Sequence, residues 1–531
     1  MPLPVSHSRS RNFVAALATV ICCASTGHAA PSSVFYIREY RVSGSTKLDS
    51  LSIQEAVYPF LGPGRGVGDV DAARAALEKA FRNKGYQTVS VLIPQQDPKY
   101  GVIRLEVVEG KVGRLRVNGA KYFLPSRVKA EAPELAEGHV PHLPTVSKEL
   151  VALNRNADRK VTPRLRTGAE PGTVDIDLDV EDKLPLHGSL ELNNRYNSNT
   201  TQLRLNGALS YGNLFQLGHT LGGNFQIAPE QSEDAKSFSG YYLARVNEGL
   251  SLMAQGSKQD SDVSTLTGSA VVGKGKTYGI RAMFDLPVRE KFYQTFSLGL
   301  DWKTASEETI SLGDQTILYQ TPIEYYPLSL THGATWMHEN GFTEWNTSLV
   351  MNLRGPGSDR SDFDYKRSGS TGSFVYLRSD LSHTQDLKSG AQLFGKLQGQ
   401  LSSQALPNGE QLSAGGLGTV RGYLESTALG DNGLLGTLEW RTPSFIGKPA
   451  KSGLRSDEWR VYTFADSGLV GIYDGLPGQD DSSIFASAGI GSNVRYKDHY
   501  NASLDVAVPF IEQVDTQQGE VRVTFRGWAD F

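Results

Sequence analysis

AGGLGTVRGY (residues 414–423) and FADSG (residues 464–468) are the two stretches that decide how this sequence folds. The first is rich in glycine, as a flexible loop is, and it carries Arg421. The second ends a run in which polar and apolar residues alternate as they do in a β-strand. If the loop folds inward against that strand, Arg421 and Asp466 can pair. An ion pair that is partly shielded from water is strong, and removal of only one of its two partners costs much stability.

Alternating segments continue on both sides of the two motifs. In residues 202–211, for example, Leu203 and Leu205 share one face while Arg204 and Asn206 share the other. This period of two is typical of barrel strands that have one face in lipid and the other in a polar lumen. The alternative is a soluble β-sandwich with one wet face, but the number of strands and the Tyr and Trp residues at strand ends favour a membrane barrel. The clearest segments are 202–211, 221–227, 392–401, 434–441, 503–510 and 521–531.

The length of this region sets the size of the barrel. Residues 186–531 number 346, and a strand with its connection takes about 22 residues, so about sixteen strands fit. A barrel of that size has a water-filled lumen that wall side chains cannot fill, and the loop around residues 405–432 is the best candidate to close it.

After residue 30 no run of about 18 apolar residues occurs, so no transmembrane helix is expected. The mean hydropathy is −0.33, and glycine (56 of 531 residues) exceeds its usual share of about 7%.

Residues 1–30 have the features of a secretory signal peptide. Arg9 and Arg11 precede a short apolar run at residues 13–24, and Gly27-His28-Ala29 supplies small residues for cleavage. A short membrane anchor is the alternative, but the apolar run is too short to span a bilayer. Cys22 and Cys23 lie within it, so the mature chain has no cysteine and no disulfide. Removal of the peptide takes the net charge from −4 to −6, which gives no support to nucleic-acid binding.

Residues 34–182 mix strands with helices, and the same β-α-α-β-β order occurs twice. Asp69 or Asp71 is expected to cap the second helix of the first copy, and Gly85 to end it. The first copy has strands at 35–42, 88–93 and 102–108 and helices at 52–60 and 69–83; the second has strands at 112–117, 160–165 and 173–180 and helices at 126–135 and 145–153.

This repeated unit resembles polypeptide-transport-associated (POTRA) domains, through short matches along both copies. With the VRGY and FADSG motifs, the whole chain from about residue 34 resembles the two-partner-secretion (type Vb) outer-membrane transporters of the haemolysin secretion/activation family. The matching segments are 84–86 (KGY), 93–96 (IPQQ), 108–110 (VEG), 117–119 (VNG), 153–154 (LN) and 171–175 (PGTVD).

The resemblance implies a division of the chain and a set of functional residues. The division is a signal peptide (1–30), POTRA domains (31–109 and 110–183) and an antiparallel transmembrane β-barrel of about sixteen strands (184–531) with a lumen loop around 405–432. The lumen-loop motif is Val420, Arg421, Gly422 and Tyr423, the barrel-strand motif that meets it is Phe464, Asp466 and Gly468, and Phe531 is the C-terminal aromatic assembly signal.

The implied function is export through the outer membrane of a Gram-negative bacterium. The POTRA domains recognise an unfolded partner exoprotein of the haemolysin or adhesin type by its N-terminal secretion domain, and the barrel passes it to the cell surface without ATP. Other expected partners are outer-membrane lipid, lipopolysaccharide and the barrel assembly machinery, and the protein is expected to be a monomer. An outer-membrane protein insertase is the alternative, although insertases usually carry more than two POTRA domains. A passive porin would lack POTRA domains, and these domains could also serve only as spacers.

No enzyme, cofactor or metal site is expected. The glycine-rich segment 62–68 lacks the Lys-Ser/Thr of a P-loop and predicts a turn. The histidines lack zinc spacing, and Ser487 and Ser492 lie in no nucleophile elbow. The pair Asp480-Asp481 predicts solvated loop charges, with weak calcium binding as the alternative.

Relatives carry an N-terminal helix that plugs the barrel, and this chain is expected to lack one. Only the four residues 31–34 precede the strand expected from Phe35, a reach of ~14 Å, whereas the apolar band of a barrel is ~25 Å tall. Closure is therefore assigned to the loop that carries Arg421.

Overall fold

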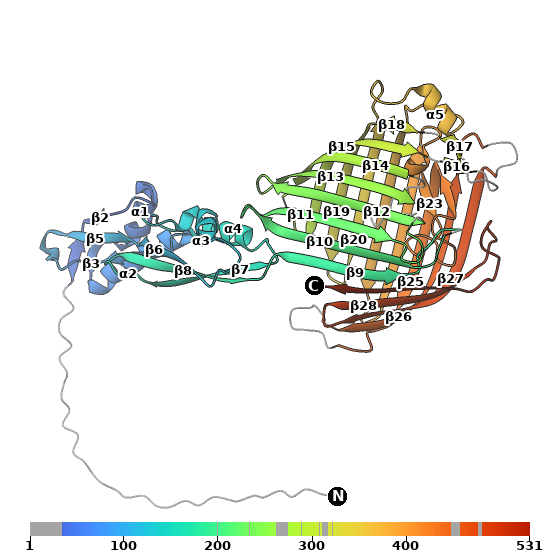
Figure 1. The fold of residues 1–531 in the computed structure, drawn as a ribbon. Coiled ribbons are helices and arrows are strands. Elements are labelled where there is room, and N and C mark those ends of the chain that lie inside the picture. Colours follow the sequence, from blue (N-terminus) through green and yellow to red (C-terminus); the bar gives the residue numbers. More distant parts are fainter. Residues whose placement is uncertain are drawn as a thin grey trace, which may run out of the picture. The chain divides into compact units, whose positions relative to one another are not determined.

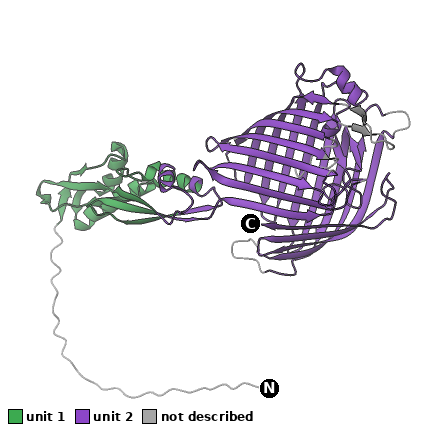
Figure 2. Ribbon diagram, in the orientation of Figure 1, with its two compact units in different colours: residues 1–117, 132–151, 162–178 green, residues 118–131, 152–161, 179–531 purple. Residues whose placement is uncertain are grey.

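The computed structural model describes residues 34–531 except 199, 233, 262–273, 288, 307, 311–316, 321, 448–456 and 476–479. The predicted signal peptide lies outside the described residues. The described residues form two compact units (Figure 2): residues 34–117, 132–151 and 162–178 in one, and those of 118–131, 152–161 and 179–531 in the other.

The first β-α-α-β-β copy departs from the sequence expectation at its start. The segment expected as one strand, 35–42, is two strands in different sheets: β1 pairs with β3, and β2 runs parallel to β5. The chain bends between them, where the N–H groups of Arg38 and Glu39 both donate to the carbonyl oxygen of Gly101, at 2.7 and 3.2 Å. The elements are β1 (Phe35–Ile37), β2 (Glu39–Ser43), α1 (Ser50–Val57), β3 (Gly62–Arg65), α2 (Val67–Asn83), β4 (Val89–Leu92) and β5 (Val102–Glu109), with 3₁₀ turns η1 (Tyr58–Phe60) and η2 (Pro98–Tyr100).

Two further expectations in this copy were wrong. The glycine-rich segment expected as a turn contains β3, because its backbone pairs with β1. Helix α2 begins at Val67 rather than Asp69; Gly66 is its N-cap, and the Asp69 carboxylate accepts from the Gly66 N–H at 2.9 Å. Asp69 therefore stabilises the first turn from inside the helix.

The second copy forms a three-stranded sheet in the order β6-β8-β7. The helix expected over 126–135 is α3 followed by a separate 3₁₀ turn, because Pro133 cannot donate a helical hydrogen bond. Its elements are β6 (Lys111–Asn118), α3 (Pro125–Ala130), η3 (Pro133–Leu135), α4 (Leu143–Leu153), β7 (Arg159–Thr167) and β8 (Thr173–Asp182).

The C-terminal region is a closed antiparallel barrel, in which β29 pairs with β9 (Figure 1). Within the described residues the barrel wall has sixteen strands, because β18 and β19 are successive segments of a single wall strand. The predicted strand number is confirmed. The strands are β9 (Leu186–Asn193), β10 (Arg204–Leu214), β11 (His219–Ile227), β12 (Ala235–Arg245), β13 (Leu250–Ser261), β14 (Lys274–Asp285), β15 (Phe292–Ser306), β18 (Ile323–Tyr325), β19 (Pro327–His338), β20 (Gly341–Asn352), β21 (Val375–Asp386), β22 (Gln392–Ser402), β25 (Asn432–Arg441), β26 (Glu458–Gly471), β27 (Ser482–Tyr496), β28 (Tyr500–Pro509) and β29 (Arg522–Asp530).

Smaller elements lie in the barrel's connections. They are the pair β16 (Glu308–Ile310) and β17 (Ile317–Gln320), helix α5 (Arg360–Lys366), the 3₁₀ turn η4 (Asn408–Glu410), and the pair β23 (Leu412–Ala414) and β24 (Ala428–Gly430). No helix in the described part of the chain is both long and apolar enough to cross a membrane.

The barrel wall is apolar outside and polar inside. On β10, Leu209 is 53% exposed, whereas Arg204 is 0% exposed and Asn206 is buried. A soluble β-sandwich would show the reverse, because its apolar faces meet in a core. Large apolar side chains are exposed all along the wall, among them Leu190, Leu252, Ile280, Leu298, Leu330 and Leu438.

Candidate functional site

The lumen loop, residues 405–432, connects β22 to β25 and is packed against inward-facing side chains. Its two limbs pair as β23 and β24, from Leu412 opposite Gly430 to Ala414 opposite Ala428. Between residues 405 and 431 only Gly418 is exposed. A solvent loop would expose most of its residues, so this segment is part of the barrel interior.

Arg421 is held by the carboxylate of Asp466 in a bidentate ion pair. The Nε–Oδ2 distance is 2.7 Å, the Nη2–Oδ1 distance is 2.8 Å, and the backbone N–H of Arg421 also donates to Oδ2 at 3.0 Å. Arg421 is 6% exposed and Asp466 is 2% exposed. The guanidinium lies over the ring of Phe464, with its carbon 3.5 Å from the ring centroid. Tyr462, Phe464 and Asp466 are all buried, as expected for the lumen face of β26.

Two further carboxylates share the guanidinium. Nη1 lies 2.8 Å from Glu439 Oε1 on β25 and 3.5 Å from Asp505 Oδ1 on β28. Burial lowers the pKa of Arg421, but the hydrogen bonds and negative charge of Asp466, with Glu439 and Asp505, outweigh burial and raise it. Arg421 is therefore a permanent cation in an acidic part of the wall.

The other residues of the two motifs also help to hold the loop tip against the barrel wall. The Tyr423 hydroxyl lies 2.8 Å from the carbonyl oxygen of Ile511 and 3.0 Å from that of Ala486, so it bridges β27 and the segment after β28. Val420 is buried in an apolar cluster with Tyr423. A Cβ at Gly468 would lie 2.5 Å from a side-chain carbon of Leu435 and 3.3 Å from Cγ2 of Val420, so glycine leaves room for the loop.

Gly422 turns the chain between Arg421 and Tyr423. Its φ is +92°, a conformation that favours glycine. A Cβ there would also lie 3.3 Å from the backbone nitrogen of Pro509. A larger residue would be strained at this φ, and its Cβ would be tightly packed against the end of β28.

Phe531, the predicted assembly signal, extends the pairing of β29 with β9. Its N–H donates to the carbonyl oxygen of Gly188 at 2.9 Å and its own carbonyl oxygen accepts from the Gly188 N–H at 3.0 Å. Its ring covers Gly188 and is largely exposed. The structure thus places Phe531 at the seam of the barrel, away from the Arg421 site.

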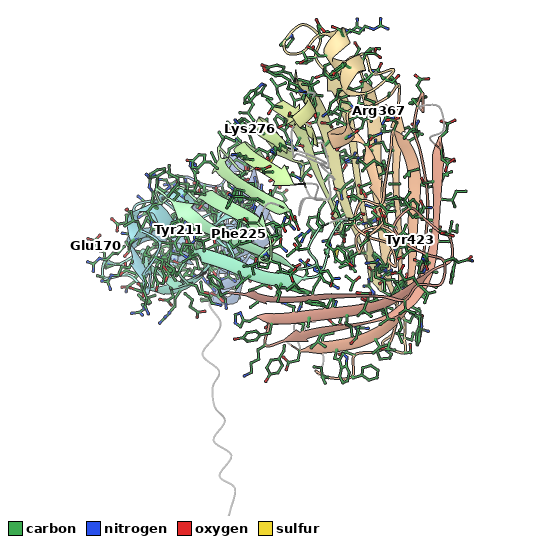
Figure 3. The ribbon with its side chains drawn as sticks, turned by 45° about the vertical axis from the view of Figure 1, so that its right-hand side comes forward. Glu170, Tyr211, Phe225, Lys276, Arg367 and Tyr423 are labelled. Carbon is green, nitrogen blue, oxygen red and sulfur yellow. The ribbon has the colours of Figure 1, made fainter. Side chains whose placement is uncertain are left out.

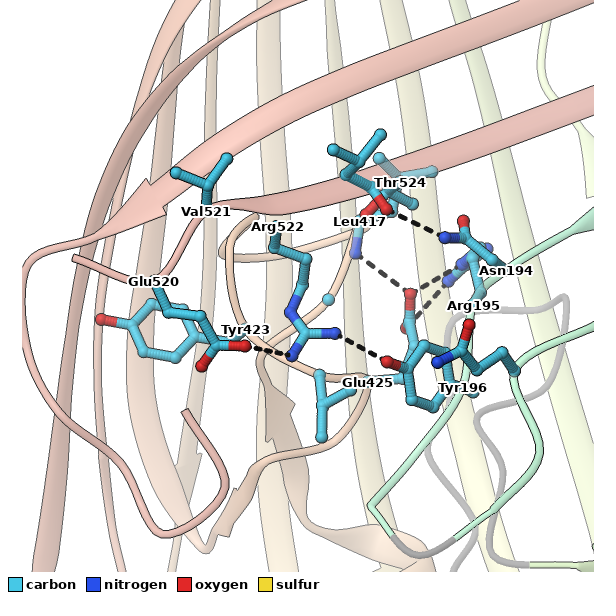
Figure 4. Close-up of a pocket in the computed structure, with 14 residues that line it drawn as sticks. Asn194, Arg195, Tyr196, Leu417, Tyr423, Glu425, Glu520, Val521, Arg522 and Thr524 are labelled. Atoms are coloured by element: carbon cyan, nitrogen blue, oxygen red, sulfur yellow. Dashed lines mark hydrogen bonds and ion pairs between the residues drawn. The ribbon is translucent and has the colours of Figure 1, made fainter. Parts of the chain in front are cut away.

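A second ion pair at the loop tip was missed by the sequence argument. Glu425 accepts from Arg195, after β9, at 2.8 Å (Nε–Oε1) and 3.1 Å (Nη2–Oε2), and Leu417 N–H donates to Glu425 at 3.1 Å (Figure 4). Arg195 and Glu425 are 230 residues apart, and neither lies in a motif that singles it out. Glu439 and Asp505 were missed for the same reason.

The remaining candidates do not assemble into a site. Ser487 is buried with its hydroxyl unpaired, and Ser492 accepts from Trp459 Nε1 at 3.0 Å. Asp480 and Asp481 border the undescribed segment 476–479. Across the described residues, no three His, Cys, Asp or Glu side chains gather as a metal site would require.

The family model for the haemolysin secretion/activation protein ShlB/FhaC/HecB matches residues 172–494, more than half of the chain. The chain belongs to this family. A second model, for the ShlB-type POTRA domain, matches residues 35–110 of this transporter. The chain is thus an outer-membrane β-barrel of the two-partner-secretion transporters, with its POTRA region in the periplasm.

Curated relatives and solved structures agree with this assignment. The outer membrane transporter CdiB of Dickeya dadantii (strain 3937) is 23% identical over 419 residues, 75% of this chain and 71% of the relative. CdiB from Escherichia coli matches in structure with a TM-score of 0.62 at 20% identity, over 97% of this chain and 93% of that one. BamA from Haemophilus ducreyi lacking POTRA domains 1–3 matches with a TM-score of 0.57 at 18% identity, over 94% and 100%. At these identities the solved structures show a shared fold.

Proposed function

We propose that this transporter recognises an unfolded partner exoprotein in the periplasm and passes it through the barrel lumen to the cell surface without ATP. The observation that carries the proposal is the lumen loop, held inside a closed barrel by the buried pair of Arg421 and Asp466. Separation of a buried ion pair leaves uncompensated buried charges, so the pair favours the closed position of the loop over partly open ones.

The part of the lumen beside the loop can form the path of the exported chain. A cavity of about 840 Å³ lies against β11–β15 and β19–β22, and most of its lining is amide and hydroxyl side chains. Four of its charged side chains form ion pairs, Arg281 with Asp301 (3.5 Å) and Lys303 with Glu410 (2.7 Å), and Asp380 accepts from Gln398 Nε2 at 2.7 Å. A wall in which neutral polar side chains predominate and most charges are paired would hold an unfolded chain only weakly, so the chain can slide. Representative lining residues are Asn224, Gln226, Gln255, Gln259, Thr277 and Thr331.

The partner is inferred to be a large exoprotein of the haemolysin or adhesin type, encoded beside the transporter. Its folding outside the cell would supply the direction, since hydrolysis of ATP is not available there. The transporter is taken to act as a monomer, surrounded by lipid and lipopolysaccharide, after insertion by the barrel assembly machinery.

The first POTRA domain offers an edge strand to such a partner. In the sheet order β2-β5-β4, β4 is at one edge and lies beside α2. A peptide in extended conformation can add to an edge strand through backbone hydrogen bonds, which tolerate many sequences. Leu92 and Ile93 at this edge are exposed and can contact apolar side chains of the added strand.

Glu78 of α2 partly occupies that edge. Its Oε1 accepts from the Val91 N–H at 3.0 Å and lies 3.0 Å from Arg74 Nη1, while Oε2 lies 3.5 Å from Arg82 Nη2. A strand that adds to β4 must displace this carboxylate. The contact protects the edge from unwanted pairing when no partner is bound.

Deletion of residues 34–109 should abolish export of the partner while leaving a barrel that folds. The reason is that the deletion removes the β4 edge but no barrel strand. Export is measured by immunoblot of the culture medium, and barrel folding by heat-modifiable migration of the outer-membrane fraction. Normal export by this variant would support the spacer interpretation of the POTRA region.

Replacement of Glu78 by alanine should strengthen binding of the partner's secretion domain about fivefold, because the added strand no longer displaces a charge-assisted hydrogen bond worth about 1 kcal/mol net. The measurement is a fluorescence titration of the full-length transporter in detergent. Glu55→Ala, at an exposed position of α1, is the matched control. Weaker binding by Glu78→Ala would mean that the partner uses another surface.

A further inference from the structure

The stem of the lumen loop, residues 405–411 and 430–432, has a buried carboxylate of its own. Glu410 is 2% exposed, and its Oε1 accepts from Lys303 Nζ at 2.7 Å and from the Tyr325 hydroxyl at 2.9 Å. Its Oε2 accepts from the Tyr376 hydroxyl at 2.6 Å. Arg378 donates to the Glu410 carbonyl oxygen at 3.0 Å. These donors come from β15, β18 and β21.

A second buried carboxylate, Asp431, lies in the other limb of the stem. It is 0% exposed, and its Oδ1 accepts from the Leu406 N–H at 2.9 Å and from Gln411 Nε2 at 3.0 Å. Its Oδ2 accepts from Arg367 Nη2 at 2.8 Å and from the Tyr473 N–H at 2.7 Å. One side chain thus joins both limbs of the stem to two other loops.

Arg367 belongs to the long connection that carries α5, and it follows that helix directly (Figure 3). The same connection inserts Phe363 and Phe374 into an apolar cluster with Leu406, at the start of the lumen loop. The Phe363 and Phe374 rings each lie 6.0 Å from the ring of Tyr325, which also donates to Glu410. The stem, the α5 connection and the barrel wall are therefore parts of one packed network.

The two ends of the loop are attached to separate parts of the wall. The tip pairs through Arg421 with β25, β26 and β28, whereas the stem pairs through Glu410 with β15, β18 and β21. Loss of the tip contact alone leaves the stem carboxylates with all their donors. Loss of the stem contact leaves a segment of about twenty residues held by the tip, through Arg421, Tyr423 and Glu425, and by apolar packing.

We propose that Glu410 and Asp431 form a stem anchor, a second set of positioning residues that holds the lumen loop across the barrel independently of Arg421. The stem anchor rests on the proposed function, since it assumes that the loop closes the export path. The stem anchor also gives the α5 connection a role in opening the loop. Movement of this connection would withdraw Arg367 from Asp431 and free the stem. The loop then has to be released at two places before a chain can pass.

The test measures steady conductance of full-length transporter in planar bilayers, with heat-modifiable migration as the check of barrel folding. Glu410→Ala and Asp431→Ala should each raise the conductance at least fivefold, and Glu410→Gln and Asp431→Asn, which keep the side-chain shape, at least twofold. Glu191→Gln, which removes a buried carboxylate paired with Arg526 at 2.7 Å elsewhere on the wall, should leave it unchanged.

A second readout follows the loop itself. The chain has no cysteine after residue 30, and Ala414 in β23 is fully buried. In an Ala414→Cys background, a membrane-impermeant maleimide should label the cysteine at least fivefold faster with Glu410→Ala or Asp431→Ala. With Arg421→Ala, labelling should stay within twofold of the parent.

Folded Glu410→Gln and Asp431→Asn variants with parental conductance and labelling would overturn the stem anchor. So would labelling in Arg421→Ala that is as fast as in the stem variants, since one contact would then hold the loop. A variant with the lumen loop shortened separates the two hypotheses. If it conducts while the stem variants stay closed, only the stem anchor fails; if it does not conduct, loop closure of the export path fails as well.

Discussion

Replacement of Arg421 by alanine should leave an assembled barrel in the outer membrane and reduce secretion of the partner at least tenfold. The barrel persists because its strands are held by their own ladders, and the pairs β25–β26 and β26–β27 each run over ten or more residues. Secretion falls because the loop tip loses its side-chain ion pair with Asp466 of β26. The measurement is an immunoblot of the medium, with heat-modifiable migration as the folding check.

The size of the effect follows from what the substitution leaves behind. Asp466 and Asp505 would remain buried without the cation that they share, whereas Glu439 would keep its ion pair with Arg441 at 2.6 Å. Removing one partner of a buried ion pair costs about 3–5 kcal/mol, and the tip would lose the side-chain contact that holds it against these carboxylates. Tyr423 and Val420 would still pack against the wall, so we expect a displaced tip rather than an unfolded loop.

Two controls make the result specific. Arg421→Lys keeps the charge but cannot make the bidentate contact with Asp466, and it should recover only part of the secretion. Arg526→Ala removes an arginine that pairs with Glu191 on the wall, and it should secrete normally. Secretion by Arg421→Ala at the wild-type level would contradict a role for this pair in export.

Shortening of the lumen loop, residues 405–432, should produce large steady currents in planar bilayers. The loop is almost wholly buried, so it fills space that the wall side chains leave open. A barrel with about sixteen strands and no loop inside has an aqueous channel. We expect the conductance to rise at least tenfold over that of the intact protein, which should stay mostly closed.

The loop that joins β11 to β12 provides the comparison. Removal of residues 229–232 shortens a connection without touching the lumen loop, and it should leave the conductance unchanged. Removal of residues 31–33, before the first strand, should also have no effect. An open pore after either change would show that closure does not depend on the lumen loop alone.

The sequence by itself determined the class of fold and one half of the site. Alternation of polar and apolar residues, as at Leu203 and Arg204, is a local property, because successive side chains of a strand point to opposite faces. It predicts a barrel wall from single segments. Glycine at 422 and 468 and the charges of Arg421 and Asp466 are also visible in the sequence, since they lie in two compact motifs.

Only the tertiary structure decided which other charges meet the lumen loop. Arg195 reaches Glu425 across 230 positions, and Lys303 reaches Glu410 across 107. Barrel closure and strand register bring such residues together. The local sequence around each residue does not predict its partner, because any inward-facing position can hold a polar side chain. The bend at Arg38 could not be predicted from the sequence for the same reason, since it depends on the distant carbonyl group of Gly101. Periodicity along one strand determines which face a residue occupies, whereas the strands that face it across the lumen determine its partner.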